Sequence, residues 1–132
     1  MIVIDTHIQI WWVEESGRLS ESQRQAIENE RRQSGIIGVS AISCIEIARL
    51  AGNGLIELPT DSLTWMLRLL SYPAVRLLPI TPEIAVRAYS LPEPFHRDPA
   101  DRILVATALE YSCPLVTSDG RILDYPHVNT IG

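Results

Sequence analysis

Short β-branched apolar runs alternate with helix-like segments along the chain, and this alternation limits the folds available to it. Runs of three or four residues rich in valine and isoleucine are typical of strands that are buried on both faces. Such strands alternating with helices predict an α/β sandwich with a mostly parallel sheet. The four expected strands and a possible short fifth are residues 2–4, 36–39, 75–78, 115–117 and 128–131.

The expected helices begin at residues that favour helix starts. Ser20 and Gln23 have the spacing of a capping box, as do Ser43 and Glu46, and a proline follows Thr81 and Asp98 at the first helical position. In the fourth helix, four apolar residues share one side: Leu63, Met66, Leu67 and Leu70. The expected helices are 6–13, 20–33, 43–51, 60–71, 81–89 and 98–111.

Length and composition indicate an ordinary globular protein. A chain of 132 residues that is 46% hydrophobic fits one domain, and we expect it to span residues 1–132. Two cysteines, Cys44 and Cys113, are too few for a disulfide framework, so we expect both to be reduced. The sequence has no signal-peptide pattern and no apolar run of membrane-spanning length, so we expect a cytoplasmic protein.

The charge balance argues against a simple nucleic-acid-binding domain. The chain has 16 acidic residues against 11 basic ones, a net charge of −5, whereas nucleic-acid binders are usually basic. All the bases are arginines. The lack of lysine also argues against a receiver-like signalling domain, which gathers acids in a similar way but needs a lysine beside them.

Two acids follow predicted strands. Asp5 ends the run Ile-Val-Ile, and Asp119 follows Leu-Val-Thr-Ser. In a parallel sheet both strand ends lie at the same edge, where ligands gather. Each acid also has a simpler explanation, because Asp5 could cap the following helix and the Ser-Asp-Gly sequence is common in turns.

Three further acids lie at or near predicted helix starts. Glu46 is in an apolar helix, where it either completes the capping box or needs a cationic partner. Asp98 and Asp101 begin the helix of the sequence HRDPADRILVATALE, where the helix dipole alone favours them. Their three-residue spacing also directs both toward the same region.

Together, these acids predict a metal site. Carboxylates held within a few ångströms of each other repel, and a hard divalent cation such as Mg²⁺ or Mn²⁺ removes that repulsion. Such an ion can activate water and neutralise the charge of a phosphodiester. The five acids also equal the whole net charge, since the other acids balance the 11 arginines. The acidic total is therefore compatible with a nucleic-acid substrate.

The order of these motifs resembles the PIN-domain family, and most closely its VapC toxins of bacterial and archaeal toxin–antitoxin pairs. The resemblance covers essentially the whole chain. The stretches that carry it are IDTHIQIWW, SAISCIEIARL, LPITPEIAVRAYSLP, HRDPADRILVATALE and PLVTSD.

The resemblance implies a three-layer α/β/α sandwich and an Mg²⁺- or Mn²⁺-dependent endoribonuclease that cleaves RNA with metal-activated water. The family's acidic quartet falls on Asp5, Glu46, Asp101 and Asp119, and Asp98 falls on a further acid that we include among the metal ligands. Thr6 and Ser118 fall on supporting hydroxyl positions. The resemblance further implies a cognate antitoxin and a homodimer.

Other residues were assigned by their surroundings. Arg97, Arg102 and Arg121 neighbour the acids and are candidates for RNA contacts. Of the adjacent Trp11 and Trp12, we expect one in the core and one at an interface. Other residues have structural expectations: His7 as a satisfied histidine, Trp65 in the core or a dimer interface, and Arg24, Arg31 and Arg32 on a solvated face.

Two alternatives to a toxin ribonuclease remain at this stage. One is a PIN ribonuclease that processes RNA outside a toxin–antitoxin pair. The other is a non-catalytic binding module, in which the acids only cap helices and turns.

Overall fold

The computed structural model describes residues 1–132 and contains one five-stranded sheet. Its strand order is β3-β2-β1-β4-β5, and every neighbouring pair is parallel. The elements are β1 (Ile2–Ile4), α1 (Thr6–Val13), α2 (Glu21–Arg32), β2 (Ile37–Ser40), α3 (Ala41–Gly52), α4 (Ser62–Leu70), β3 (Val75–Leu78), α5 (Pro82–Ala88), α6 (Pro99–Glu110), β4 (Leu115–Val116), α7 (Gly120–Leu123) and β5 (Thr130–Ile131).

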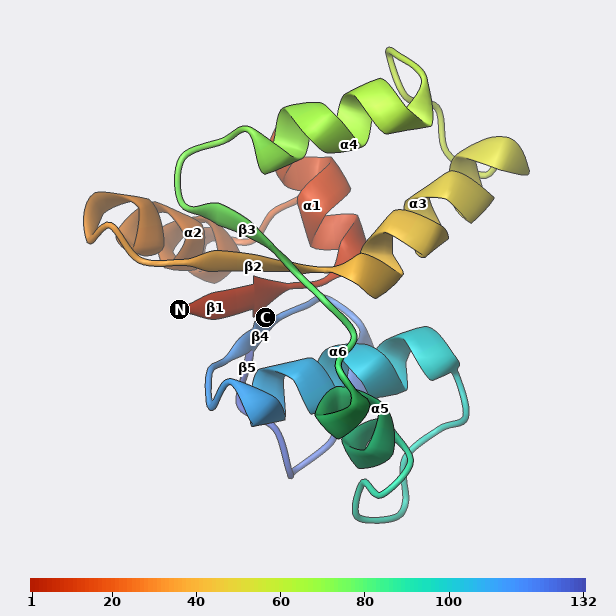
Figure 1. Cartoon of the computed structure of the whole chain (residues 1–132). Coiled ribbons are helices and arrows are strands. Elements are labelled where there is room, and N and C mark those ends of the chain that lie inside the picture. The colour runs from red at the N-terminus through yellow and green to blue at the C-terminus, as the bar shows by residue number, and fades with distance from the viewer.

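The central strand β1 shows how the sheet separates two layers of core. Ile2 and Ile4 pack with α1 to α4 on one face, while Val3 packs with α6 and α7 on the other. All three side chains are buried, as expected for a strand covered on both faces. Figure 1 shows α1, α3 and α4 on one side of the sheet and α5 and α6 on the other. The predicted three-layer α/β fold is confirmed.

Most helix starts follow from local sequence. The Ser20–Gln23 capping box forms as predicted, with both reciprocal bonds, and Asp98 caps α6 with Pro99 at the first helical position. Asp5 caps α1, so the capping function proposed for this acid is present. One short helix was not predicted: α7 begins at Gly120, where the sequence indicated only a turn.

Two local expectations were wrong. Helix α3 begins three residues earlier than predicted, with Ser40 as its N-cap, so Ser43 is buried inside the helix and forms no capping box with Glu46. The expected apolar side of α4 does not face the core as a whole. Trp65 and Leu69 are buried there, whereas Leu63 and Leu67 are exposed.

The two adjacent tryptophans are both half-buried, which differs from the expectation of one in the core and one at an interface. Trp12 packs edge-on against Tyr72 at 5.3 Å between ring centroids, and Trp11 lies beneath the Arg18 guanidinium. Trp65 is fully buried, so its predicted place in the core is confirmed. The chain forms no helix that is both long and apolar enough to cross a membrane.

Candidate active site

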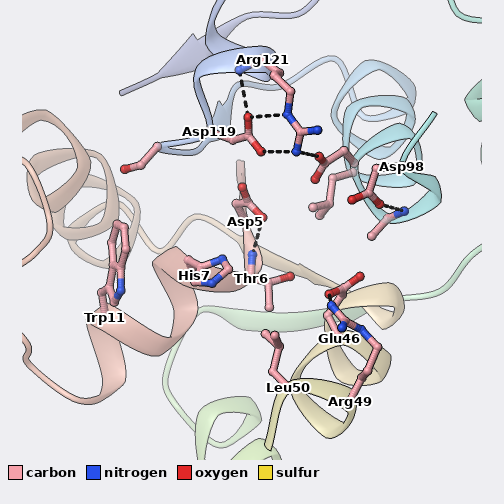
Figure 2. Close-up of a pocket in the computed structure, with 14 residues that line it drawn as sticks. Asp5, Thr6, His7, Trp11, Glu46, Arg49, Leu50, Asp98, Asp119 and Arg121 are labelled. Carbon is pink, nitrogen blue, oxygen red and sulfur yellow. Dashed lines mark hydrogen bonds and ion pairs between the residues drawn. The ribbon is translucent and has the colours of Figure 1, made fainter. Parts of the chain in front are cut away.

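A pocket of about 320 Å³ lies at the edge of the sheet where β1 and β4 end. The fold brings all seven predicted site residues to its wall (Figure 2). They come from the β1–α1 junction, α3, the start of α6 and the β4–α7 loop. They are Asp5, Thr6, Glu46, Asp98, Asp101, Ser118 and Asp119.

Asp5 is held rigidly at the base of this pocket. Its side chain accepts hydrogen bonds from the Thr6 N–H at 2.6 Å and from the Thr117 hydroxyl at 2.6 Å. Burial raises the pKa of Asp5 and outweighs these bonds, which lower it. The Thr117 oxygen also accepts the Asp119 N–H at 3.0 Å. Thr117 therefore fixes Asp5 and the backbone of Asp119 at once.

Asp101 is the acid most strongly affected by its surroundings. Burial, followed by the charges of Asp98, Asp5 and Asp119, raises its pKa to about 7. It is 8% exposed and comes from the first turn of α6. The carboxylates from three elements are thus close enough to repel one another, as the sequence predicted.

His96 lies against Asp101, with 3.1 Å between His96 Nε2 and Asp101 Oδ2. The two atoms are not aligned for a hydrogen bond, so the buried Nε2 has no hydrogen-bond partner. Nδ1 accepts the Asp98 N–H at 3.3 Å, which assigns the proton of the neutral ring to Nε2. Burial and the charge of Arg121 lower the pKa of His96, so the neutral ring is favoured.

Arg121 neutralises part of the cluster. Its guanidinium lies 3.3 Å from Asp119 Oδ2 and 3.4 Å from Asp101 Oδ2. Burial alone would raise the pKa of Asp119, but the hydrogen bonds and charge of Arg121 lower it overall. The side chain of Arg121 is 60% exposed, so it reaches the pocket from solvent.

Glu46 lies on the opposite wall (Figure 2). Its carboxylate pairs with Arg49 one turn further along α3, at 3.0 Å. The sequence left open whether Glu46 completes a capping box or has a cationic partner, and in the structure its partner is Arg49. Asp98 accepts the Ala100 N–H at 2.9 Å, so its carboxylate has a capping role at the rim of the pocket.

The two supporting hydroxyls are held by buried partners. Thr6 shares a hydrogen bond of 2.9 Å with Ser43, which ties the start of α1 to α3. Ser118 accepts a bond of 2.7 Å from Gln23 Nε2, which also donates to the Thr117 carbonyl at 3.3 Å. Helix α2 thereby anchors the loop that carries Asp119.

The three arginines proposed for RNA contact have different environments. Arg97 and Arg121 are exposed beside the acids. Arg102 is buried, and its guanidinium donates to the backbone carbonyls of Ala88, Phe95 and His96. The predicted RNA contact of Arg102 does not fit this placement, because the side chain of this fourth residue of α6 is directed toward the end of α5 and the α5–α6 connection.

The donor set suits a hard divalent cation. The acids supply only oxygen ligands, and burial together with the charges of its neighbours makes an ionised Asp101 unfavourable, which a bound cation would relieve. No three side chains are yet arranged to hold a metal ion. Two of the acids are paired with arginines instead, Asp119 with Arg121 and Glu46 with Arg49.

Sequence reasoning missed four residues of this site: Thr117, His96, Gln23 and Arg49. Thr117 directly precedes Ser118 in the motif that was recognised, so its hydroxyl could have been considered. Gln23 had been assigned to the capping box alone. Its contact with Ser118 joins residues 95 positions apart in sequence, which no local pattern reveals.

The fold and the pocket define a class: an α/β protein with a carboxylate-rich site at the carboxyl edge of a parallel sheet. Comparison with known proteins makes the class specific. The pattern of the PIN-domain family matches residues 2–128. The chain is 40% identical over 126 residues to Ribonuclease VapC22 of Mycobacterium tuberculosis (strain ATCC 25618 / H37Rv), covering 96% of this chain and 92% of that protein.

Solved structures agree on the fold. VapBC2 from Rickettsia felis, bound to a DNA fragment from its promoter, has a TM-score of 0.72 at 15% identity, covering 98% of this chain and 97% of the other. FitAcB from Neisseria gonorrhoeae has a TM-score of 0.67 at 20% identity, covering 100% of this chain and 97% of the other. The chain belongs to the PIN-domain family and resembles its VapC members, which confirms the family predicted from the motifs.

Proposed function

We propose that this chain is a Mg²⁺- or Mn²⁺-dependent endoribonuclease that acts as the toxin of a type II toxin–antitoxin pair. The observation that carries the proposal is the convergence of five acids from four separate parts of the fold on one pocket. The 40% identity to a VapC ribonuclease supports RNA as the substrate. The similarity in fold to proteins solved as toxin–antitoxin complexes agrees with an antitoxin partner.

In this proposal Asp5, Glu46, Asp98, Asp101 and Asp119 hold the cation, with Thr6 and Ser118 supporting them. When bound, the ion would supply Lewis acidity toward water and toward the scissile phosphate. No side-chain nucleophile is needed.

The chain's own residues then position the reacting groups. Thr117 keeps Asp5 and Asp119 in a fixed relation through two hydrogen bonds. Arg121 is exposed beside the acids, and its planar guanidinium suits two phosphate oxygens. Arg97 is a second exposed arginine, adjacent in sequence to Asp98. These two arginines bind the RNA backbone in our proposal.

The protein partners are proposals on the same basis. We expect a cognate antitoxin and a homodimer, and exposed apolar side chains on several elements agree with protein interfaces. They include Ile45 on α3, Leu63 and Leu67 on α4, and Val86 on α5. Co-expression with the product of a small neighbouring gene should relieve growth arrest and yield a stable complex.

The central test is RNA cleavage by the purified wild-type chain and Asp101→Asn. We expect cleavage by the wild type with Mg²⁺ or Mn²⁺, none with chelator, and none by the variant at matched metal concentration. Circular dichroism would verify that the variant folds. RNA cleavage retained by Asp101→Asn would rule out this site.

Sequencing of RNA 5′ ends after induction in cells would identify the target, with Asp5→Ala as the control. New ends that depend on Asp5 would support a ribonuclease. A PIN ribonuclease of RNA processing would leave growth intact and give trimmed precursors. A binding module would give no new ends.

A further inference from the structure

A second groove, rich in rings, adjoins the acidic pocket. It encloses about 450 Å³. Arg121 belongs to the walls of both cavities, so the two adjoin at this side chain. The groove is lined by Pro94, Phe95, His96, Arg121, Asp124, Tyr125 and Pro126.

The rings that line the groove are held by contacts within the protein. Phe95 packs against Tyr125 at 4.6 Å and against His96 at 4.5 Å between ring centroids. The Tyr125 hydroxyl donates to the Pro92 carbonyl at 2.6 Å. Arg102, which was expected to meet RNA, instead donates to the carbonyls of Phe95 and His96 and fixes the segment that carries both rings.

The charges along the groove favour a phosphate at one end and a nucleobase at the other. Arg121 lies at the end that meets the acidic pocket, and it favours a phosphate. Asp124 is an exposed acid in the groove, and it repels a phosphate but can accept hydrogen bonds from base N–H groups. Between them lie the exposed rings of Pro94 and Pro126, the half-buried ring of His96, and the edges of Phe95 and Tyr125, which are 9% and 4% exposed. This order of phosphate site and ring surface matches one nucleotide of a single strand.

We propose that this groove binds the unpaired nucleobase of the nucleotide next to the scissile phosphate, with its phosphate on Arg121. The inference rests on the proposed ribonuclease function and adds a base-binding subsite to it. The base packs against Pro94, His96 and Pro126 and against the exposed edge of Phe95, and Asp124 favours bases that present amino or imino hydrogens. The groove thus contributes to the choice of cleavage site.

Photo-crosslinking tests the position of the base in the unaltered protein. Single-stranded RNA carrying 5-iodouridine would be irradiated with the wild-type chain in chelator, so that no cleavage is needed. We expect crosslinked peptides that contain Phe95, His96 or Tyr125. Crosslinks found only outside residues 94–96 and 121–126 would overturn the proposal.

Cleavage kinetics test its contribution to catalysis. Phe95→Leu keeps an apolar side chain but removes a ring, and Tyr111→Leu removes an exposed ring outside the groove as the control. With a substrate of mapped cleavage site, we expect kcat/KM to fall about tenfold or more for Phe95→Leu alone. An abasic nucleotide on one side of the scissile phosphate should cause a similar loss in the wild type.

The possible outcomes separate the subsite from the ribonuclease function. A wild-type chain that cuts no RNA with Mn²⁺ would refute the function. Normal cleavage of the abasic substrate, or by folded Phe95→Leu, would refute only the groove. Protection of the groove from hydrogen exchange by an antitoxin but not by RNA would assign it to the protein partner and also overturn the proposal.

Discussion

At the scale of single residues, Thr117 connects two acids that are 114 positions apart in sequence. Its buried hydroxyl donates to Asp5 and accepts from the Asp119 N–H. Thr117→Val keeps the shape but leaves a buried carboxylate oxygen and an N–H without partners. We expect unfolding free energy to fall by about 1–3 kcal/mol, measured by urea denaturation at pH 7.

Thr107→Val is a matched control for this change. Thr107 is equally buried, but its hydroxyl donates to the Ile103 carbonyl within α6. That carbonyl is part of the helix, so losing the hydroxyl leaves fewer groups unpaired. A loss for Thr117→Val no larger than that for Thr107→Val would contradict the bridging role.

Asp101 should make stability depend on pH in the metal-free protein. Its folded pKa of about 7 lies above the ordinary value of 3.8. The folded state therefore holds the proton more tightly, so stability is fully present below about pH 4 and is lost as pH rises through 7. The loss is a few kcal/mol at most, because the carboxylate keeps some solvent contact.

Asp101→Asn removes that titration. In chelator we expect the variant to match the wild type near pH 4.5 and to exceed its unfolding free energy at pH 8 by roughly 1–3 kcal/mol. Urea denaturation across this range measures the difference. Parallel stability curves would show that Asp101 ionises normally.

Asp61→Asn should change the pH dependence of stability in the opposite direction to Asp101→Asn. Hydrogen bonds from the Thr64 hydroxyl and N–H lower the pKa of Asp61, which caps α4 far from the pocket. A lowered pKa gives stability at neutral pH that disappears as pH falls. We therefore expect Asp61→Asn to weaken the protein slightly at pH 7 and not in acid.

At the scale of elements, the sequence predicted most strands and helices because their determinants are local. Short apolar runs, the Ser20 capping box and the Thr81-Pro82 and Asp98-Pro99 starts each act within a few residues. The start of α3 was misplaced because Ser40 and Ser43 both suit an N-cap. In the structure Ser40 is the cap, and Ser43 shares a hydrogen bond with Thr6, a contact between distant residues that no local pattern reveals.

The site was predictable to a similar degree. Parallel strand ends and helix starts bring the acids to one edge, so the composition of the pocket followed from topology. The hydrogen-bonding and ion-pair partners of those acids did not follow from the topology. Asp101, for example, contacts both Arg121 and His96. These contacts depend on side-chain directions that arise only when the chain has packed into its tertiary structure.

Helix α2 shows how one element supports the site from outside. Gln23 is buried, accepts the Ser20 N–H within its own helix and donates to Ser118 and the Thr117 carbonyl. Gln23→Ala should cost about 1–3 kcal/mol in unfolding free energy. Because the loop of Asp119 loses its anchor, we also expect faster hydrogen exchange at Asp119.

The exposed Gln25 on the same helix supplies the comparison. Its amide bonds only to Glu21, at 3.4 Å on the surface. Gln25→Ala should leave both stability and exchange nearly unchanged. If Gln23→Ala destabilises the protein but exchange at Asp119 stays normal, Gln23 acts only as a helix cap.

At the scale of the whole molecule, the net charge of −5 is concentrated at one place. Without the five pocket acids, the acidic and basic residues of the chain would balance. Arg121 and Arg49 offset part of this local charge, but Asp101 still has a pKa of about 7. The fold therefore carries an electrostatic cost that a divalent cation would remove.

This cost leads to a prediction for thermal melting. We expect Mn²⁺ to raise the melting temperature of the wild type, because a cation bound only by the folded state stabilises it by about 2.7 kcal/mol at 100 times its Kd. That corresponds to a shift of roughly 5–15 °C for a domain of this size. Sodium chloride at matched ionic strength separates binding from screening.

Substitutions of single acids show where Mn²⁺ binds to raise the melting temperature. Asp5→Asn and Asp101→Asn should lose most of the Mn²⁺ shift, since each removes a proposed ligand from the pocket. Glu57→Gln removes the same charge from an exposed position outside it and should keep the full shift. Equal shifts in all three variants would mean that Mn²⁺ acts on net charge alone. A loss confined to the pocket variants would instead tie the excess acidity of the whole chain to one cation site, independently of any measurement of RNA cleavage.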